Sequence, residues 1–460
     1  MLLKLNQLLA LPFFAAAIWV LTLSGASVPA AAAAGGALAL VVVGMWATRF
    51  TSEHMTALLF FLAAMVFDIA EPGAVFAGFS AGAFWLLFGG MILGSAVGRT
   101  GLGARLARTM ALRLGVSYTG LLIGIAAVAL ALSFVMPSST GRVVLLMPVA
   151  VSLAEAFGFG PDSKGRLGIT VTAALSAVVP GFGILPANVP NLVMLGGADT
   201  LYGLEITYAE WLLIHFPVLG FLKAAAIVLV ARVLFPADLV SAVEDESGRR
   251  PLSAEEKRLA ILLAGALLLW ATDFLHGIAP SWVALAAGLA CFLPPFRLME
   301  QEEVAQAIQI RPLIFIAGVL SLGPVVTSTG FADVLAGEFL SVAGLRPGEN
   351  AMNFATIVGA SIATTLLGTA PTVPAVWTPL AEGLAQATGM PLKSVVMLQV
   401  LAFSTLILPY QVPPAVVGLQ LGKVPLKPGI IATLWVAVIT LVVLLPLDYL
   451  WWEALGLFDG

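Results

Sequence analysis

The chain has few of the residues on which soluble and metal-dependent proteins rely. Only 10% of its 460 residues are charged, it has three histidines, and its one cysteine is Cys291. A single cysteine excludes an intrachain disulfide and a cysteine-rich metal site. None of the histidines (His54, His215 and His276) has a metal-ligating neighbour at helical spacing, which argues against metal catalysis.

Long basic tracts are also missing, and the net charge is −4, so we expect no binding to nucleic acid. Hydrophobic residues, in contrast, make up 60% of the chain, and the mean hydropathy is +1.05. A soluble domain of this size could not bury so much apolar surface. The composition therefore predicts an all-α polytopic membrane protein whose surface largely contacts lipid.

Apolar runs are frequent along the whole chain. Because a membrane-spanning helix requires about 20 apolar residues, the sequence predicts about 11 transmembrane helices, at 8–24, 34–49, 55–70, 84–98, 117–135, 208–235, 259–275, 279–294, 312–327, 351–367 and 428–452. Four more stretches are interrupted by Pro, Gly, Ser and Thr: 136–158, 167–197, 369–388 and 394–423. Irregular backbone at membrane depth is tolerated only inside protein or around a watery cavity. These stretches predict two re-entrant hairpins and broken helices.

One sequence pattern occurs twice. Residues 88–107 are FGGMILGSAVGRTGLGARLA and residues 317–336 are AGVLSLGPVVTSTGFADVLA, with aligned glycines and a shared Thr-Gly pair. A second echo relates ILPANVPNLVMLGG (184–197) to ILPYQVPPAVVGLQLG (407–422). Two similar halves in so apolar a chain are typical of transporters built from internal repeats.

The charges beside the two copies differ in sign. Four arginines (Arg99, Arg105, Arg108 and Arg113) lie in or just after the first copy, whereas Asp333 and Glu338 lie in or just after the second. Because basic residues near membrane spans stay cytoplasmic, we expect inverted repeats, a cytoplasmic N-terminus and an external C-terminus. The predicted division is an extra N-terminal span at 1–33, a first repeat at 34–235, a cytoplasmic linker at 236–258 and a second repeat at 259–460.

Two interrupted motifs occupy corresponding places in the halves. Residues 137–142 are Pro-Ser-Ser-Thr-Gly-Arg, and residues 368–372 are Gly-Thr-Ala-Pro-Thr. A helix that restarts after such a turn exposes N–H groups and a positive dipole end, which suits an anion. Unwound carbonyls and hydroxyls suit a small cation. The alternative is a hydroxyl-rich kink that satisfies its own backbone.

A second pair of motifs is rich in proline. Residues 185–191 are LPANVPN and residues 408–414 are LPYQVPP. Prolines break helices and leave carbonyls free, and Asn188, Asn191 and Gln411 offer both donors and acceptors. These amides favour a binding site, with hydrogen bonding between helices as the alternative.

Arg142 directly precedes an apolar run. An arginine inside the membrane is a functional hypothesis by default, and its planar fork suits a carboxylate. The alternative is a side chain that extends to the cytoplasmic interface.

Together these strings resemble the divalent anion–sodium symporter family, whose members carry dicarboxylates, citrate and sulfate. The segments 78–107 and 207–218 (TYAEWLLIHFPV) are similar to family segments. Residues 138–140 stand where the family has Ser-Asn-Thr at the first hairpin tip, and residues 369–371 stand at the second tip. Segments 186–191 and 409–414 resemble the loops of the broken helices.

The resemblance implies a homodimer in membrane lipid, with a fixed scaffold and a mobile, elevator-type transport domain. A first sodium ion would be bound by Ser138, Ser139 and Ala187, and a second by Thr365, Ala370 and Tyr410. The candidate substrate-binding residues, from the resemblance and the motifs together, are Ser138, Ser139, Thr140, Arg142, Asn188, Thr369, Ala370, Pro371, Gln411 and Val412.

Several positions depart from the family pattern. Ser139 and Ala370 replace its two asparagines, Tyr410 replaces a small residue, and Arg142 adds a positive charge. We therefore hypothesise that Arg142 partly replaces sodium as the counter-charge.

The expected function is secondary active transport of small dianions, such as di- or tricarboxylates or sulfate, across the bacterial inner membrane. Cation-coupled symport by alternating access is expected, with no cofactor except sodium as the coupling ion. The alternatives are sodium-independent exchange, proton coupling and an uncoupled anion channel. An enzyme is not expected: the G-x-S-x-G string at 78–82 lacks the preceding strand that serine hydrolases require.

Overall fold

The computed structural model describes residues 5–106, 109, 117–239 and 251–459. Within these residues the regular structure is helical, apart from one isolated bridge between Ser24 and Val28. Nine helices of this part are long and apolar enough to cross a membrane. The predicted all-α membrane protein is thus confirmed, while the number of crossings and the inverted repeats stay predictions.

Several helices of the described residues precede the first hairpin, and residues 102–106 are also helical. The named helices are α1 (Leu5–Thr22), α2 (Ala30–Thr48), α3 (Glu53–Val66), α4 (Pro72–Val75), α5 (Ala77–Ser80) and α6 (Gly82–Thr100). The first hairpin and the elements after it are α8 (Tyr118–Val135), α9 (Ser139–Ala156), α10 (Lys164–Ser176), η1 (Pro180–Gly183), η2 (Leu185–Ala187), α11 (Val189–Tyr202), α12 (Tyr208–His215), η3 (Phe216–Leu222) and α13 (Lys223–Leu234).

The second half begins at Ala254, so residues 254–258 of the predicted linker are helical. Its first elements are α14 (Ala254–Ala271), α15 (Asp273–His276), α16 (Pro280–Ala290), η5 (Gln301–Glu303), α17 (Val304–Ala307), α18 (Ile310–Ser328) and α19 (Phe331–Ala343). The second hairpin and the elements after it are α20 (Asn350–Leu367), α21 (Thr372–Trp377), α22 (Ala381–Thr388), α23 (Leu392–Phe403), η6 (Pro409–Gln411), α24 (Pro413–Leu421), α25 (Leu426–Ile439), η7 (Thr440–Leu444) and α26 (Leu445–Ala454).

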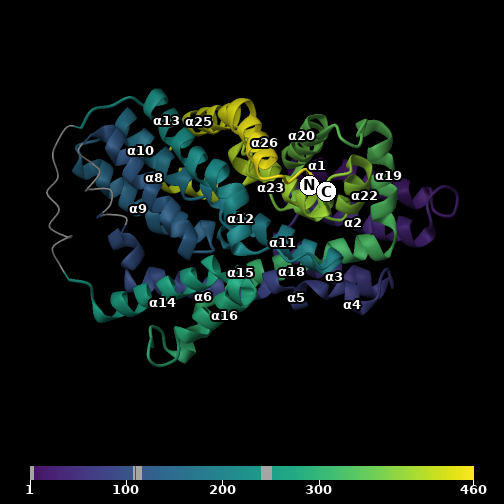
Figure 1. Cartoon of the computed structure of the whole chain (residues 1–460), viewed down its shortest axis with the longest axis horizontal. Helices are drawn as coiled ribbons and strands as arrows, with labels where there is room; N and C mark the ends of the chain where they lie inside the picture. The colour runs from purple at the N-terminus through teal and green to yellow at the C-terminus, as the bar shows by residue number, and fades with distance from the viewer. Residues whose placement is uncertain (1–4, 107–108, 110–116, 240–250, 460) are drawn as a thin grey trace.

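The same order of elements therefore occurs twice. In each half a helical hairpin is followed by a helix, an irregular turn, a short helix and a long helix that contains a π-helical segment (η3 or η7). In Figure 1 the first hairpin, α8 and α9, lies at the left of the molecule, and α20 and α22 of the second lie at the right. The hairpins thus lie on opposite sides of the molecule along its long axis (Figure 1).

The two halves interlock through crossed contacts. Helix α9 packs on α24, and α11 packs on α21. Gly418 of α24 allows close approach to both α9 and α10: a Cβ there would lie 3.2 Å from a methyl group of Val143 in α9 and 2.9 Å from the Cβ of Ala174 in α10. Small residues allow such close approach between membrane helices.

The hairpin turn between α8 and α9 follows from local chemistry. Met136 is extended before Pro137, which agrees with the conformational restriction that proline imposes on the residue before it. The Ser138 hydroxyl then accepts a hydrogen bond from the Gly141 N–H at 3.1 Å and caps the new helix. The sequence signal for an interruption therefore marks a true helix restart.

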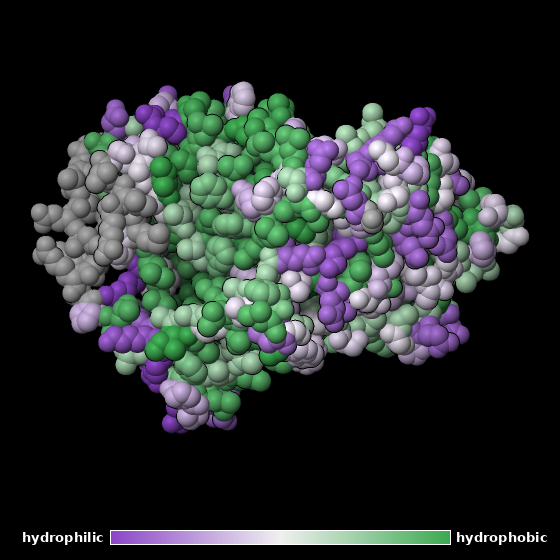
Figure 2. Space-filling model, in the orientation of Figure 1, coloured by the Kyte–Doolittle hydropathy of each residue, from purple (hydrophilic) through white to green (hydrophobic). Residues whose placement is uncertain are grey.

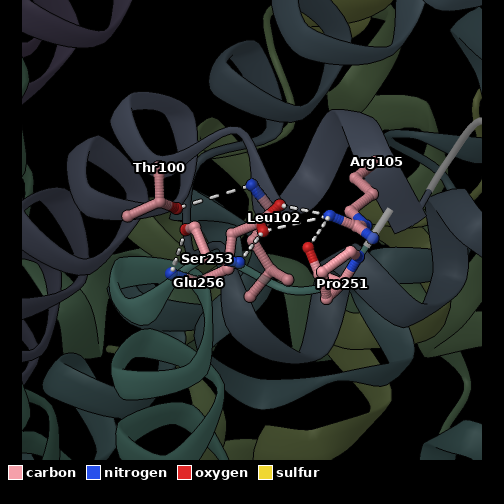
Figure 3. Close-up of polar contacts among 6 residues, drawn as sticks. All are labelled: Thr100, Leu102, Arg105, Pro251, Ser253 and Glu256. Atoms are coloured by element: carbon pink, nitrogen blue, oxygen red, sulfur yellow. Dashed lines mark hydrogen bonds and ion pairs between the residues drawn. The ribbon is translucent and has the colours of Figure 1, made fainter. Parts of the chain in front are cut away.

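Polar contacts join the segment that follows α6 to the start of α14 (Figure 3). Arg105 donates to the Glu256 carboxylate at 3.1 Å and to the Pro251 carbonyl at 3.3 Å. Glu256 also accepts from the Ser253 N–H at 2.7 Å, while the Ser253 hydroxyl accepts from the Glu256 N–H. This capping box fixes the first turn of α14 and sets its carboxylate beside the arginine.

An ion pair between Arg99 and Glu303 makes a second connection from α6, to η5. The Glu300 N–H and the Arg99 guanidinium lower the pKa of the Glu303 carboxyl. Two basic residues of the first sequence copy thus pair with acids of the second half.

The surface is apolar over much of the face that Figure 2 shows, around α10, α13 and α25. Large apolar side chains are exposed on the long helices: Phe221, Leu229, Val233, Trp435, Val442 and Leu450. Such a continuous apolar surface requires a lipid environment.

Candidate functional site

Each hairpin tip lies against the irregular turn that breaks a helix of its own half. The first tip faces the turn at 177–188, and the second tip faces the turn at 404–412. The ring of Phe182, in the first turn, lies 5.6 Å from the ring of Phe403, the last residue of α23 before the second turn. The two breaks therefore meet inside the bundle, where both rings are buried.

Arg142, in the first turn of α9, ties the first tip to its turn. The side chain is 0% exposed. Its Nε donates to the Ala177 carbonyl at 2.8 Å, Nη1 donates to the carbonyls of Met136 and Ala187, and Nη2 donates to Asn188 Oδ1 at 3.0 Å. The interfacial alternative for this arginine is wrong, because the guanidinium lies inside the protein among carbonyl dipoles.

Gly181 leaves room for that guanidinium. A Cβ at this position would lie 2.8 Å from Arg142 Nη2 and 3.2 Å from Asn188 Nδ2. Both distances are too short for a carbon contact, so any larger residue would displace the fork. Gly181 is therefore required because it has no side chain. Its backbone conformation is not one that only glycine adopts.

The asparagines of the first turn hold its irregular backbone. Asn188 Nδ2 donates to the Val178 carbonyl at 3.1 Å, and Asn191 Nδ2 donates to the Ile184 carbonyl at 2.9 Å. Carbonyls that the broken helix would leave unpaired are satisfied in this way. Both amides thus position the turn, and a substrate contact by Asn188 stays a prediction.

The hydroxyl residues of the first tip differ in exposure. Ser138 and Ser139 are half-buried, whereas Thr140 is exposed. All three stand at the N-terminal end of an 18-residue helix, where N–H groups and the helix dipole attract negative charge. The tip therefore combines an anion-favouring helix end with the positive charge of Arg142.

The second tip is joined to its turn by different residues. The Ala370 N–H donates to the Gln411 carbonyl at 2.8 Å, and Gln411 Nε2 donates to Thr365 Oγ1 at 2.6 Å. Gln411 Oε1 accepts from the N–H groups of Ile407 and Leu408 at 2.7 Å. One glutamine thus fastens the hairpin and shapes the turn.

The remaining predicted residues surround this contact. The Thr369 N–H donates to Thr372 Oγ1 at 3.3 Å, Pro371 is half-buried and Val412 is buried. Tyr410 is 40% exposed, and its hydroxyl donates to the Leu366 carbonyl at 2.7 Å. The structure thus brings the second set together around the contact between the hairpin and its turn.

Two buried charges were missed by the sequence analysis. Lys223 is 0% exposed and donates to the main-chain and side-chain oxygens of Ser404, at 3.0 and 3.1 Å. Asp448 is also 0% exposed, and neither carboxylate oxygen has a hydrogen-bond partner among the described residues. A charge inside an apolar run was the available signal.

A resident transition-metal site finds no support in the described part of the chain, where no three His, Cys, Asp or Glu side chains cluster. The polar atoms at the tips are carbonyl, hydroxyl and amide groups, which bind small cations or anions. Residues 2–458 match a family described as "Sodium:sulfate symporter transmembrane region".

The chain belongs to this sodium:sulfate symporter family. The resemblance to divalent anion–sodium symporters is therefore confirmed, and the chain is an integral membrane protein of a transporter family, not an enzyme.

Relatives with printed descriptions agree with the family. A "Membrane protein" of Cupriavidus necator is 32% identical over 276 residues, which cover 58% of this chain and 53% of that protein. The chain thus spans about half the length of this relative. The "Sodium-dependent dicarboxylate transporter SdcS" of Staphylococcus saprophyticus is 23% identical over 90% of this chain and 85% of its own length.

A solved structure supports the fold. The YdaH transporter of Alcanivorax borkumensis, whose crystal structure is described as having an unusual topology, superposes with a TM-score of 0.58 and 17% identity. The superposition covers 85% of this chain and 89% of that one. At this identity the likeness concerns the fold alone.

Proposed function

We propose that this member of the family is a secondary active transporter of small dianions, namely di- or tricarboxylates or sulfate-like anions, across the bacterial inner membrane. The observation that carries the proposal is the pairing of each hairpin tip with a broken helix, by Arg142 in one half and by Ala370 and Gln411 in the other. Corresponding interruptions in two repeats are where transporters of this architecture bind substrate.

The substrate site would lie between the tips. Thr140 is exposed at the N-terminal end of α9, Arg142 lies buried two residues further along, and Pro371 is half-buried at the second tip. A dianion there would gain from the helix dipole and from the fixed positive charge. The remaining predicted residues, Ser138, Ser139, Asn188, Thr369, Ala370, Gln411 and Val412, would form the walls.

Alternating access would follow from relative movement of two groups of helices. Helices α6 and α16 pack with backbone contact, because a Cβ on Gly89 would lie 2.4 Å from the main chain of Ala284. This tight pair would belong to a fixed scaffold, and the hairpins with their broken helices would form the mobile transport domain. Assembly as a homodimer through the scaffold is part of the same proposal.

The coupling ion follows from the relatives' names. SdcS is described as sodium-dependent, which supports sodium as a candidate coupling ion here. The resemblance assigns the positions of such ions to Ser138, Ser139 and Ala187 and to Thr365, Ala370 and Tyr410. The alternatives within this architecture are proton coupling and exchange of one anion for another.

Transport by reconstituted protein tests the proposal. Liposomes containing the purified protein are preloaded with unlabelled succinate, citrate or sulfate and then exposed to a trace of the same labelled anion. A carrier accumulates label transiently above equilibrium, because its site returns loaded. Simple equilibration would indicate a channel, and no flux of any dianion under any cation gradient would refute dianion transport.

A further inference from the structure

The oxygens at which coupling sodium ions are expected already accept hydrogen bonds from the protein. The resemblance assigns Ala187 to a first sodium ion, and the carbonyl of Ala187 accepts from Arg142 Nη1 at 2.9 Å. It assigns Thr365 to a second sodium ion, and Thr365 Oγ1 accepts from Gln411 Nε2 at 2.6 Å. In each half, therefore, a nitrogen donor points at an oxygen that a metal cation would need.

The first of these positions has the chemistry of a cation site. Four oxygens converge on the Arg142 guanidinium, from Met136, Ala177, Ala187 and Asn188. Four of its five N–H groups are used, and no carboxylate among the described residues forms a salt bridge with it. In unwound transporter helices, a sodium ion is likewise surrounded by neutral oxygens. Here the positive charge among these oxygens is the guanidinium of Arg142.

The second position contains no positively charged side chain, but its oxygens also have hydrogen-bond donors from the protein. The Thr365 hydroxyl donates to the Ile362 carbonyl at 2.7 Å and accepts from Gln411. The Gln411 carbonyl, in turn, accepts from the Ala370 N–H. An N–H group directed at these oxygens takes the place of a cation and would repel one. A sodium ion could bind only after Gln411 had turned away.

We propose that Arg142 and Gln411 occupy the two sodium positions permanently, so that this chain carries its dianion without sodium. The inference rests on the proposed function and narrows it. Because no cation accompanies the substrate, net uptake would move two negative charges against an inside-negative potential. One-for-one exchange of dianions moves no net charge, and it is the mode that this arrangement favours.

Binding of sodium can be tested without transport. Thermal unfolding of the purified protein is compared in sodium chloride and choline chloride of equal concentration. We expect the wild type to unfold at the same temperature in both salts, because a ligand stabilises only the state that binds it. In Arg142→Ala the vacated oxygens should bind sodium, and sodium should raise the midpoint by at least about 2 °C.

Matched variants separate this effect from general damage. Arg166 is also buried and pairs with Glu155 at 3.0 Å, away from the tips. Arg166→Ala should lower the midpoint equally in both salts. Gln411→Ala opens the second position and provides an independent variant if Arg142→Ala fails to fold. A wild type stabilised by sodium overturns the inference, and so do opened variants that sodium leaves unchanged.

A transport experiment distinguishes failure of sodium independence from failure of dianion transport itself. Counterflow of labelled succinate or sulfate is measured with sodium and again with choline on both sides of the membrane. We expect the two rates to agree within about twofold, and net uptake into empty liposomes to be slow. A loss of about tenfold or more in choline refutes sodium independence but leaves dianion transport standing. Absence of flux in both salts refutes the proposed function itself.

Discussion

The buried Lys223 and Asp448 give a prediction whose size follows from the structure. Lys223 directly follows the π-helical segment η3, and Asp448 stands four residues after η7, so the two occupy similar places in the two halves. Both side chains are fully buried, and no ion pair within 4.0 Å joins them among the described residues. Asp448 has no hydrogen-bond donor among these residues, so we predict that Lys223 supplies its compensating charge at longer range.

Replacing one of these two residues should lower the free energy of unfolding more than replacing both. Lys223→Met leaves Asp448 buried without a counter-charge, and breaking a buried pair costs about 3–5 kcal/mol. Replacing both by apolar side chains, as in Lys223→Met with Asp448→Leu, is often neutral or stabilising. The unfolding entropy is about 2 cal/mol/K per residue, and the chain has 460 residues. The loss of stability in Lys223→Met therefore corresponds to a fall of about 3–5 °C in Tm.

Thermal unfolding in detergent, followed by near-UV circular dichroism, measures all four proteins of this double-mutant cycle. The expected interaction energy between the two sites is about 3 kcal/mol in favour of the native pair. Additive losses, with a double variant as unstable as the two single variants together, would refute the electrostatic coupling of these helices.

Two smaller predictions concern glycine and the α6–α14 contact. Gly181→Ala should reduce the rate of dianion exchange by roughly tenfold or more, because the added Cβ displaces the Arg142 guanidinium. The control is Gly359→Ala, whose new Cβ would have nothing within 4 Å. It should exchange dianions at the wild-type rate in the same assay. Glu256→Ala should lower stability by about 1 kcal/mol and Glu256→Gln by less, because glutamine keeps the capping box and loses only the ion pair with Arg105. Equal thermal midpoints for the two Glu256 variants would contradict that division.

The sequence predicted the positions of the helices better than the contacts between them. The interruption at 137–142 and the proline-rich turns became true breaks, because proline and N-capping hydroxyls act on neighbouring backbone. The long apolar run at 428–452 became α25, η7 and α26 in continuous succession. Local signals of this kind are contained in a few consecutive residues.

The direction of the Arg142 side chain could not be predicted in the same way. Its partners Ala177, Ala187 and Asn188 lie 35 to 46 residues away in sequence. Helical periodicity leaves open whether the side chain faces those oxygens or the membrane interface. The same limit applies to Lys223, whose partner Ser404 is 181 residues away.

The central claim is that a dianion binds between the two hairpin tips, and substrate protection of single cysteines tests it most directly. With the buried native thiol removed by Cys291→Ser, cysteine is placed at Thr140, at Pro371 or, as a control, at Val342, which is 81% exposed on α19. We expect succinate or sulfate to slow maleimide labelling at both tips and to leave the Val342 position unchanged. Protection at neither tip, or at one tip alone, would contradict a site shared by the two halves.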